Sequence, residues 1–514
     1  MKAYNKVPVG FAGGLNKDLP SQDLDNQSWS EIHNLRMKDS RLIPVQGYAP
    51  VFAPLPQPPE HVLGLVKQGT PTLFIAGNGE LHQNTNAIWT DVSRLVGGAY
   101  NTGVPWQSAV LNNTVFMNNG TDVLQVLEQS DTEFKDSASI PVNFRAKIFR
   151  GFKNYLFALN INEGVSDIPS GVRWSDPADP GLEPPSWDIT DPTTQAGQLV
   201  LADTDGECVD AMQLRDQLMI YKTDSVYSCQ FIGGVYVFSF QKVISDRGCL
   251  STGCVAQFEN SHFVVGFEDI YIHDGLQAKS ISEGRIKNFF YNDLDQEYLD
   301  NVFTIAHKDE KEIWICYPND DAIGGACNQA LVWNWVSNVW TTRDIPNILD
   351  AGLAVIDPKI DDVWDVGLDD TWDLGGLHWD ANNYSQANLS LVICSQEDDA
   401  LYVMDDTATF DGATFTYALE KDSFAMGDAN NAKYLNHLTP DVEGAGIVYM
   451  RFGFQLHLSE GVRWGPPSMY TLGKFRAYTR GQGRYVSSKF YGDTVDAIPS
   501  FGGFEYFITV EGEK

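Results

Sequence analysis

DQLMIYKTDSVYSCQF (residues 216–231) and GGVYVFSFQKVIS (residues 233–245) are followed by NSHFVVGFEDIYIHDG (260–275) and LQAKSISEG (276–284). Each pair has the pattern of a β-meander: a short apolar strand, a polar turn, an alternating strand, a glycine turn and another strand. A sheet of this kind has two faces and cannot bury both of them alone. The stretch Leu199–Gly284 therefore predicts further copies of the meander on both sides.

The two meanders are separated by the polar corner Ser245-Asp246-Arg247-Gly248. We interpret this corner as the connection between consecutive sheets rather than as an active-site loop. On that interpretation, Arg247 is expected to be tied to nearby carboxylate or carbonyl oxygens within the propeller, because a guanidinium has five N–H donors and no acceptor.

Similar stretches recur every 40 to 50 residues, which is the range of four-stranded propeller blades. We predict an all-β fold with a β-propeller of about seven blades, six being the alternative count; a set of β-sandwiches would share the same rhythm of strands and turns. Besides the two meanders above, the expected copies lie at 62–93, 109–137, 146–190, 301–346 and 389–412.

The chain has 514 residues, which exceeds the usual size of one hydrophobic core. Residues 1–60 read as an extended N-terminal segment with a Pro-rich linker; within them, Leu24–Asn34 is a candidate for a short helix because Ser28 and Glu31 have capping-box spacing. We assign 61–414 to the propeller, with an acidic, Trp-rich insertion at 357–383. Residues 415–514 have longer alternating strands and predict a β-sandwich-like platform domain.

The formal net charge is −33, which argues against a general nucleic-acid binder, since such proteins neutralise phosphates with Lys and Arg. The charge is uneven. Residues 350–422 hold 17 acidic and 2 basic residues, whereas residues 461–492 hold six basic residues and no acidic one.

Two segments are candidates for a subunit or partner interface. The basic segment could meet DNA phosphate or the acidic surface of another subunit, and the net charge favours the protein partner; an ordinary solvated face would also explain it. Its cations at every fourth position, Arg476, Arg480 and Arg484, would share one face of a regular strand. The indoles of the acidic insertion could dock on a neighbouring surface or pack on their own propeller. The candidate residues are Arg463, Lys474, Arg476, Arg480, Arg484, Lys489, Trp364, Trp372 and Trp379.

The seven cysteines are an odd number and several stand inside apolar strands, which indicates reduced, buried thiols made in a cytosol. No run of about 18 apolar residues predicts a membrane span, and the N-terminus lacks the apolar region of a secretory signal.

Motifs for catalysis or metal binding are weak. Asp203, Asp205 and Gly206 lack the further ligands of a calcium loop, so a β-turn is the simpler interpretation. His273 shares a strand face with Asp269 alone, which is too little for a metal or for acid–base work. The nine histidines show no metal-binding spacing, and no nucleophile elbow is present. We predict a protein that is not an enzyme and has no catalytic residue, metal or cofactor.

Several stretches resemble one family. GFAGGLNKDLPSQDL and HNLRMKDSRLIPVQGY, near the N-terminus, resemble the opening of phage tail and head-completion proteins. VRWSDPADPGLEPPSW (172–187) and Ser245–Gly275 resemble propeller blades of the tail nozzle, or tail-hub, proteins of short-tailed bacteriophages, which stabilise packaged DNA. GGFEYFIT, after GRYVSSKFYG, resembles the closing platform domain of that family.

This resemblance implies a structural virion protein in the phage tail, assembled in the bacterial host cytoplasm as a homohexameric ring. Such a ring lies below the portal and the adaptor (head–tail connector), lines the DNA exit channel and retains the packaged genome. It carries tail fibre or tail needle proteins, and double-stranded DNA passes through its lumen without sequence-specific binding. From the residues alone, a propeller enzyme acting on glycans and a soluble propeller binding module remain alternatives.

Overall fold

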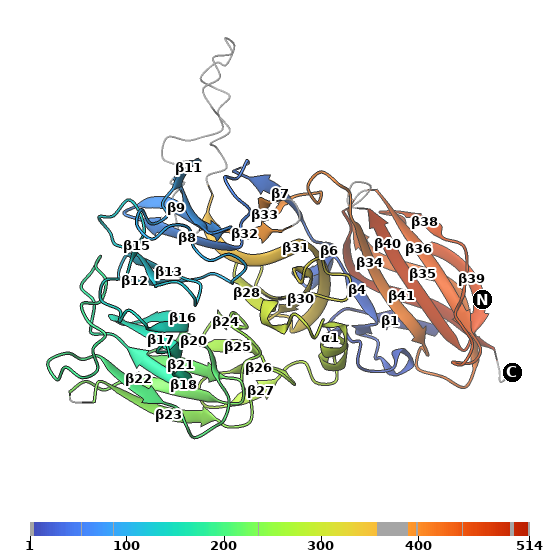
Figure 1. The fold of residues 1–514 in the computed structure, drawn as a ribbon. Coiled ribbons are helices and arrows are strands. Elements are labelled where there is room, and N and C mark those ends of the chain that lie inside the picture. Colours follow the sequence, from blue (N-terminus) through green and yellow to red (C-terminus); the bar gives the residue numbers. More distant parts are fainter. Residues whose placement is uncertain are drawn as a thin grey trace, which may run out of the picture. The chain divides into compact units, whose positions relative to one another are not determined.

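The computed structural model describes residues 5–52, 54–85, 87–234, 236–356, 389–396, 399–444, 446–493 and 498–511. Strands dominate this part of the chain (Figure 1). The chain divides into two compact units. One comprises residues 1–49, 247–347 and 405–514, and the other comprises residues 50–246 and 348–404. The predicted domain boundaries at residues 60 and 414 differ from this division and stay a prediction.

Four antiparallel sheets of four strands follow one another in residues 50–246. Each sheet is built from strands that are consecutive in the chain, as the meanders predict (Figure 1). The strands are β8 (His61–Lys67), β9 (Thr70–Gly77), β10 (Glu80–Thr85) and β11 (Ile88–Asp91); β12 (Gln107–Leu111), β13 (Thr114–Asn118), β14 (Gln125–Leu127) and β15 (Lys135–Asp136); β16 (Arg145–Phe152), β17 (Tyr155–Asn162), β18 (Asp167–Trp174) and β19 (Gly197–Val200); and β20 (Cys208–Leu214), β21 (Gln217–Lys222), β22 (Val226–Phe231) and β23 (Phe238–Ile244).

The described residues contain three more sets of four strands. The long strand β31 belongs to two of them, because it pairs with β30 and, over Ile348–Val355, with β32. The fold is thus an all-β propeller with seven blades, which confirms the predicted fold class and the preferred blade count. The strands are β24 (Val255–Phe258), β25 (Ser261–Val265), β26 (Ile270–His273) and β27 (Ala278–Ser280); β28 (Phe303–His307), β29 (Glu312–Tyr317), β30 (Cys327–Asn334) and β31 (Val339–Val355); and β31 again with β32 (Leu389–Ser395), β33 (Ala400–Thr407) and β7 (Gly47–Val51).

The apolar cores lie between consecutive sheets. Phe74 on β9 packs in one cluster with Val115 and Met117 on β13, and Ile148 on β16 packs in another with Ile220 on β21. Each of these side chains is almost fully buried. Since burying a large apolar side chain contributes about 1.5–3 kcal/mol, each sheet depends on its neighbours for most of its stability.

In Leu199–Gly284, the structure corrects one prediction and confirms another. Leu199 does not begin a new meander; it lies on β19 and pairs with Val172 as the last strand of the preceding sheet. The corner Ser245–Gly248 lies outside the strands and joins two sheets, as predicted. Arg247 forms an ion pair of 2.9 Å with Asp269 and lies over the ring of Tyr271, so the expected tie is confirmed.

The C-terminal residues form a sandwich with strands from the N-terminal segment. One sheet contains β40 with Phe490, the facing sheet contains β41 with Phe504, and these two rings stack at 4.1 Å. This confirms the predicted platform. The strands of the first sheet are β4 (Glu31–His33), β34 (Thr416–Phe424), β40 (Tyr485–Asp493), β36 (Ile447–Gln455), β37 (Arg463–Trp464) and β38 (Ser468–Thr471); those of the second are β1 (Asn5–Val9), β5 (Leu35–Lys38), β6 (Arg41–Pro44), β35 (Ala432–Glu443), β39 (Ala477–Gly483) and β41 (Ser500–Glu511).

The helix predicted at Leu24–Asn34 is wrong. Ser28–Trp29 forms β3, which pairs with β2 (Gly14–Leu15), and β4 follows it. Pairing with distant strands outweighs the local capping signal, because β4 gains partners in both β34 and β31. The helical elements of the described residues are α1 (Lys287–Asp293), η1 (Ser21–Asp23) and η2 (Leu299–Asn301), none of which the sequence pattern singled out.

A buried lysine fastens the N-terminal segment to the platform. Lys421 on β34 donates through Nζ to the carbonyl oxygens of Asp25 and Ser28, at 2.6 and 2.5 Å, and lies over the ring of Trp29. Burial lowers the pKa of Lys421 to about 8, against the opposing field of Asp25. The lysine satisfies carbonyl groups that the irregular segment would otherwise bury without donors.

A buried cluster of charges ties the same segment to the propeller strands of its unit. Asp405 accepts from Arg36 at 2.7 Å and from Arg343 at 2.9 Å, and Arg36 also pairs with Glu312 at 3.0 Å. Burial opposes ionisation of Asp405, but the guanidiniums of Arg343 and Arg36 outweigh it and lower its pKa to about 2. Arg343 is fully buried and stacks over the ring of Trp314.

We expect Asp405→Asn to lower the free energy of unfolding by about 3–5 kcal/mol, because it leaves two buried guanidiniums without their shared carboxylate. Asp441→Asn is the matched control, since Asp441 pairs with Arg41 at 3.3 Å but is 65% exposed; its cost should be about 0–1 kcal/mol. Urea unfolding at neutral pH measures both. Equal losses in the two variants would contradict the role of the cluster.

The same pair has a predicted pH dependence. The folded-state pKa of Asp405 is about 2 and its ordinary value is 3.8, so its ionic contribution is present above pH 3.8 and is lost as the pH falls through 2. The difference in unfolding free energy between wild type and Asp405→Asn should therefore shrink between pH 4 and pH 2. A difference that stays constant across this range would show that charge is not its source.

Candidate functional site

The basic residues predicted as an interface lie on the platform but do not form one cluster. Arg463 is on β37, Lys474 and Arg476 are in the loop before β39, and Arg480 is on β39; all four are exposed. Arg484, between β39 and β40, and Lys489, on β40, are half-buried. Arg463 has a weak ion pair with Glu460 at 3.5 Å, and its side chain is 77% exposed.

Lys489 is not a free cation. It forms an ion pair of 2.7 Å with Glu420 on the neighbouring strand. The strand registers place Glu31, Glu420, Lys489 and Arg451 in one row across four strands. The two acidic side chains are neighbours in this row, and the two basic side chains follow them. The charges of this row balance one another, and the part of Lys489 in an interface stays a prediction.

The prediction that Arg476, Arg480 and Arg484 share one face is wrong. In the pairing of β39 with β35, Tyr478 lies opposite His437, but Gly481 lies opposite Leu435. One extra residue is therefore accommodated in β39, and such a bulge breaks the regular alternation of side chains. Arg484 lies beyond the end of the strand, where its N–H donates to the carbonyl oxygen of Gln455.

Strand β39 is the end strand of its sheet, with β35 as its neighbour there. Two large aromatic side chains lie exposed on or beside it: Phe475 at 72% and Tyr478 at 73%. The guanidinium of Arg476 lies 5.2 Å from the centroid of the Phe475 ring. We call Lys474, Phe475, Arg476, Tyr478 and Arg480 the platform edge. It combines the residue types that are enriched at protein interfaces.

The platform edge continues onto an aromatic row of the sheet. His437 stacks on Phe507 at 4.4 Å, and its ring lies 6.3 Å from that of Tyr478. Burial and the charge of Arg476 lower the pKa of His437, which favours the neutral imidazole in this row. The sequence analysis missed these aromatic residues, although KFRAYTR (474–480) shows them interleaved with the cations.

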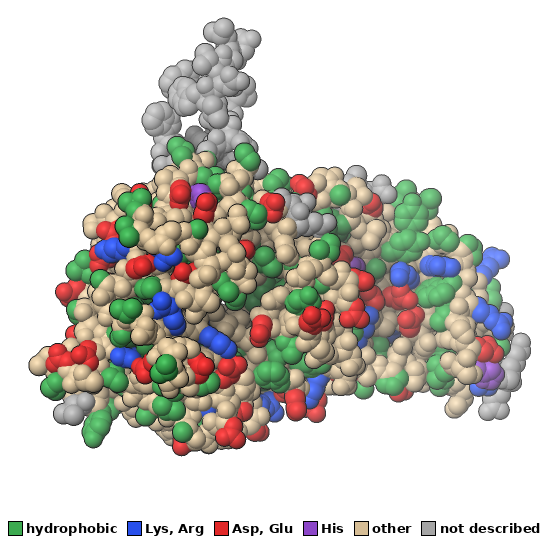
Figure 2. Space-filling view, viewed as in Figure 1, with side chains coloured by type: hydrophobic (Ala, Val, Ile, Leu, Met, Phe, Trp, Pro, Cys, Tyr) green, Lys and Arg blue, Asp and Glu red, His purple; other side chains and the backbone are tan. Residues whose placement is uncertain are grey.

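The other sheet of the platform also exposes apolar side chains. Figure 2 shows them gathered over the region of β36 and β38. Tyr449 stacks on Tyr491 at 5.6 Å and pairs across the strands with Met469, which is 69% exposed; Ile447 is 38% exposed. An exposed apolar strip of this kind marks an interaction surface more often than a free surface.

The predicted indoles Trp364, Trp372 and Trp379, with the acidic insertion that carries them, lie outside the described residues. Their part in an interface stays a prediction. Among the described residues, no group of three or more His, Cys, Asp or Glu side chains is placed to hold a metal ion. All seven cysteines are buried thiols outside disulfide bonds. In the part of the chain that the structure describes, no helix combines the length and the apolarity that crossing a bilayer requires.

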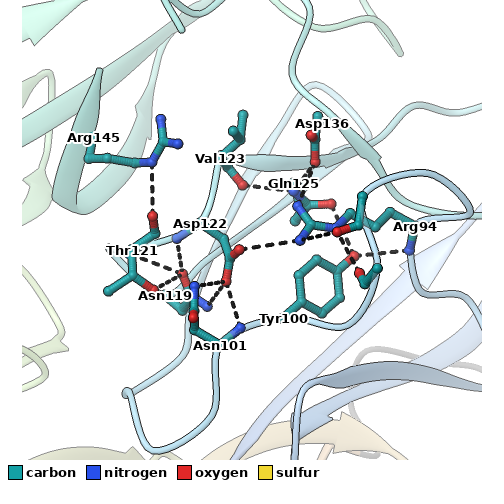
Figure 3. A network of polar contacts seen from close by, with 12 residues as sticks. Arg94, Tyr100, Asn101, Asn119, Thr121, Asp122, Val123, Gln125, Asp136 and Arg145 are labelled. Carbon is teal, nitrogen blue, oxygen red and sulfur yellow. Dashed lines mark hydrogen bonds and ion pairs between the residues drawn. The ribbon is translucent and has the colours of Figure 1, made fainter. Parts of the chain in front are cut away.

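The polar network in Figure 3 resembles a binding site but is satisfied by its own members. Asp122 accepts hydrogen bonds from the backbone and side chain of Asn101, from Asn119 and from Arg94. Burial raises the pKa of Asp122, but the donors from Asn119 and Asn101 outweigh it and the net shift is downward. The network pins the loop between β11 and β12 onto its neighbouring sheet.

The rest of this network involves Tyr100. Its hydroxyl donates to Gln125 at 3.0 Å and accepts from the backbone N–H of Arg94, while the guanidinium of Arg94 lies over its ring. Burial raises the pKa of Tyr100 to about 12, so it stays a neutral donor. We assign the network a structural role.

We expect Asp122→Ala to lower the free energy of unfolding by about 2–4 kcal/mol, because several part-buried donors lose their charged acceptor. Asp188→Ala is the control, since Asp188 accepts from Thr190 within a solvent-exposed turn and should cost much less. Chemical denaturation of both variants makes the comparison. If Asp122→Ala is as stable as wild type, the structural role that we assign to the network is wrong.

Comparison with known proteins adds little to this picture. No protein-family description matches the chain, and no curated protein matches it. Among solved structures, the chain is similar to one titled "Crystal Structure of Mitotic Checkpoint Complex", with 11% identity over 69% of this chain and 96% of that one, at a TM-score of 0.37. It is also similar to "YCF48 bound to D1 peptide", with 9% identity over 70% and 94%, also at 0.37. Likenesses this weak carry no argument about function.

Proposed function

We propose that the chain is a structural virion protein that forms a homohexameric ring in the tail of a short-tailed bacteriophage. The ring lines the DNA exit channel, retains the packaged genome and connects the adaptor and portal to distal tail parts, including fibre or needle proteins. The ring assembles in the cytoplasm of the bacterial host. The platform edge supplies part of the contact between subunits.

The observation that carries the proposal is the platform edge itself. An end strand leaves backbone N–H and C=O groups unpaired, and proteins usually protect such an edge. Here a bulge and the exposed Arg480 hinder the addition of a further strand, but the edge also exposes the rings of Phe475 and Tyr478. Since the chain has a net charge of −33, a second copy offers an acidic surface for the cations of the platform edge.

The charge also supports the relation to DNA. An acidic wall repels phosphate, so a DNA rod can move past it without the tight binding that clustered Lys and Arg would cause. The seven buried thiols, none of them in a disulfide, suit assembly in a reducing cytoplasm. The resemblance of Val172–Trp187 and Ser245–Gly275 to tail nozzle blades points the same way.

The mass of the purified full chain tests the proposal. We expect native mass spectrometry and negative-stain images, at rising concentration and with the adaptor protein added, to show rings of six 57.1 kDa chains. Tyr478→Ala should weaken the association roughly tenfold or more, as loss of an interface anchor does, and Arg480→Glu should act in the same direction. Lys308→Glu, an exposed charge reversal elsewhere, is the control and should leave assembly unchanged.

Two results would contradict this function. A chain that stays monomeric with the adaptor present, and cleaves glycans, would be the propeller enzyme. A monomer that instead captures one protein ligand through its blades would be the binding module. If rings form but Tyr478→Ala and Arg480→Glu assemble normally, the ring stands and the platform edge is not its interface.

A further inference from the structure

In the unit that comprises residues 50–246 and 348–404, one histidine contacts two polar side chains, and the three residues belong to three different strands. Nδ1 of His61, on β8, lies 2.6 Å from a carboxylate oxygen of Asp350, on β31. Nε2 of the same imidazole lies 2.9 Å from Oγ of Ser108, on β12. The two ring nitrogens thus contact a carboxylate on one side and a hydroxyl on the other.

For the neutral imidazole, these contacts determine the tautomer. The carboxylate of Asp350 can only accept, so the Nδ1–H of His61 donates to it. In the neutral imidazole the other nitrogen then has a free lone pair, and the Ser108 hydroxyl donates to it. This is the arrangement of nucleophile, general base and orienting acid that activates a serine in acyl transfer.

The supporting contacts hold the orienting carboxylate in place. The same oxygen of Asp350 accepts the backbone N–H of Val62 at 3.0 Å. The side chains of His61 and Asp350 are 12% and 24% exposed, so both are mostly buried and a small part of each reaches solvent. Ser108 is half-buried, which leaves its hydroxyl within reach of a small molecule.

The position of the three residues suits a site rather than a core contact. His61 is the first residue of β8 and Ser108 the second of β12, and each strand is the end strand of its sheet. Alternate N–H groups along the free edge of an antiparallel end strand point away from its partner, and on β8 the N–H of Val62 is one that donates to Asp350.

We propose that Ser108, His61 and Asp350 form an acyl-transfer site that hydrolyses small, uncharged carboxylic esters, an activity beyond the structural role. The substrate is small because Ser108 is only half exposed. An anionic ester is disfavoured, because a carboxylate lies next to the base and the chain has a net charge of −33; the uncharged ester is the simplest substrate that meets this condition.

The reaction has two balanced steps. The Ser108 oxygen bonds to the ester carbonyl carbon while its proton passes to Nε2 of His61; the imidazolium then protonates the departing alkoxide, and the alcohol leaves. Water next attacks the acyl-serine, giving its proton to the same nitrogen. The acyl–oxygen bond breaks, the carboxylic acid leaves and the Ser108 hydroxyl is restored. Asp350 keeps the Nδ1–H bond throughout and takes no proton.

A fluorophosphonate probe tests this directly on the full-length wild-type protein. We expect one covalent label per chain, located on Ser108 by peptide mass spectrometry, and hydrolysis of 4-nitrophenyl acetate that the probe abolishes. His61→Gln should lower the rate of labelling and the rate of ester hydrolysis by about 100-fold or more, since a positioned base contributes 10²–10⁴-fold. Asp350→Asn should also lower both rates, because an amide presents N–H groups and misorients the imidazole.

The control is Ser170→Ala. Ser170 is also half-buried, and its hydroxyl donates to the carbonyl oxygen of Gly206 without a histidine partner. It should neither carry the label nor change the rates. If folded wild-type protein is not labelled at Ser108, or if labelling is the same in His61→Gln, the three residues are only a structural tie between sheets and the proposal fails. Because the wild type itself decides this, a variant that does not fold cannot obscure the result.

Discussion

A sheet with apolar side chains on both faces must be covered on both faces, and the structure depends on this constraint. The cluster of Phe74 with Val115 and Met117 contains residues of two consecutive sheets, and neither sheet could bury them alone. The long strand β31 extends the same principle, because it contributes one end to each of two sheets. Each blade is therefore stable only as a member of the series, and the N-terminal strand β7 joins β33 to complete the last one.

The repeats could be predicted because a meander is local: its turns set the register of strands that are adjacent in sequence. What the sequence could not show is where a segment goes when its partner is distant. Leu24–Asn34 has a capping signal, yet Ile32 pairs with Leu419, nearly the whole chain away. Leu199 was assigned to the wrong sheet for a related reason, since a Pro-rich loop separates it from its partner Val172.

The candidate site was predictable only in part, and the reasons are physical. The cations from Arg463 to Lys489 stand out in the sequence, but the bulge in β39 and the pairing of Lys489 with Glu420 depend on neighbouring strands. The contacts of His61 with Ser108 and Asp350 could not be predicted either. A histidine alone in a strand indicates no chemistry, and it gains two polar partners only when three sheets are side by side.

Several of the Lys and Arg side chains are buried, and this affects the charge of the protein surface. Arg36, Arg343 and Lys421 are buried and saturate internal oxygens, where they act as fixed ties within the fold. Lys222 does the same for the turn after β19, donating to Leu201 and Thr204. Cations that are buried in the fold cannot neutralise carboxylates at the surface. The solvent-facing shell is therefore more acidic than the net charge of the whole chain suggests. Against such a shell, exposed cations gathered on and beside one end strand, with aromatic rings between them, provide the attraction and the apolar contact that association with an acidic partner requires.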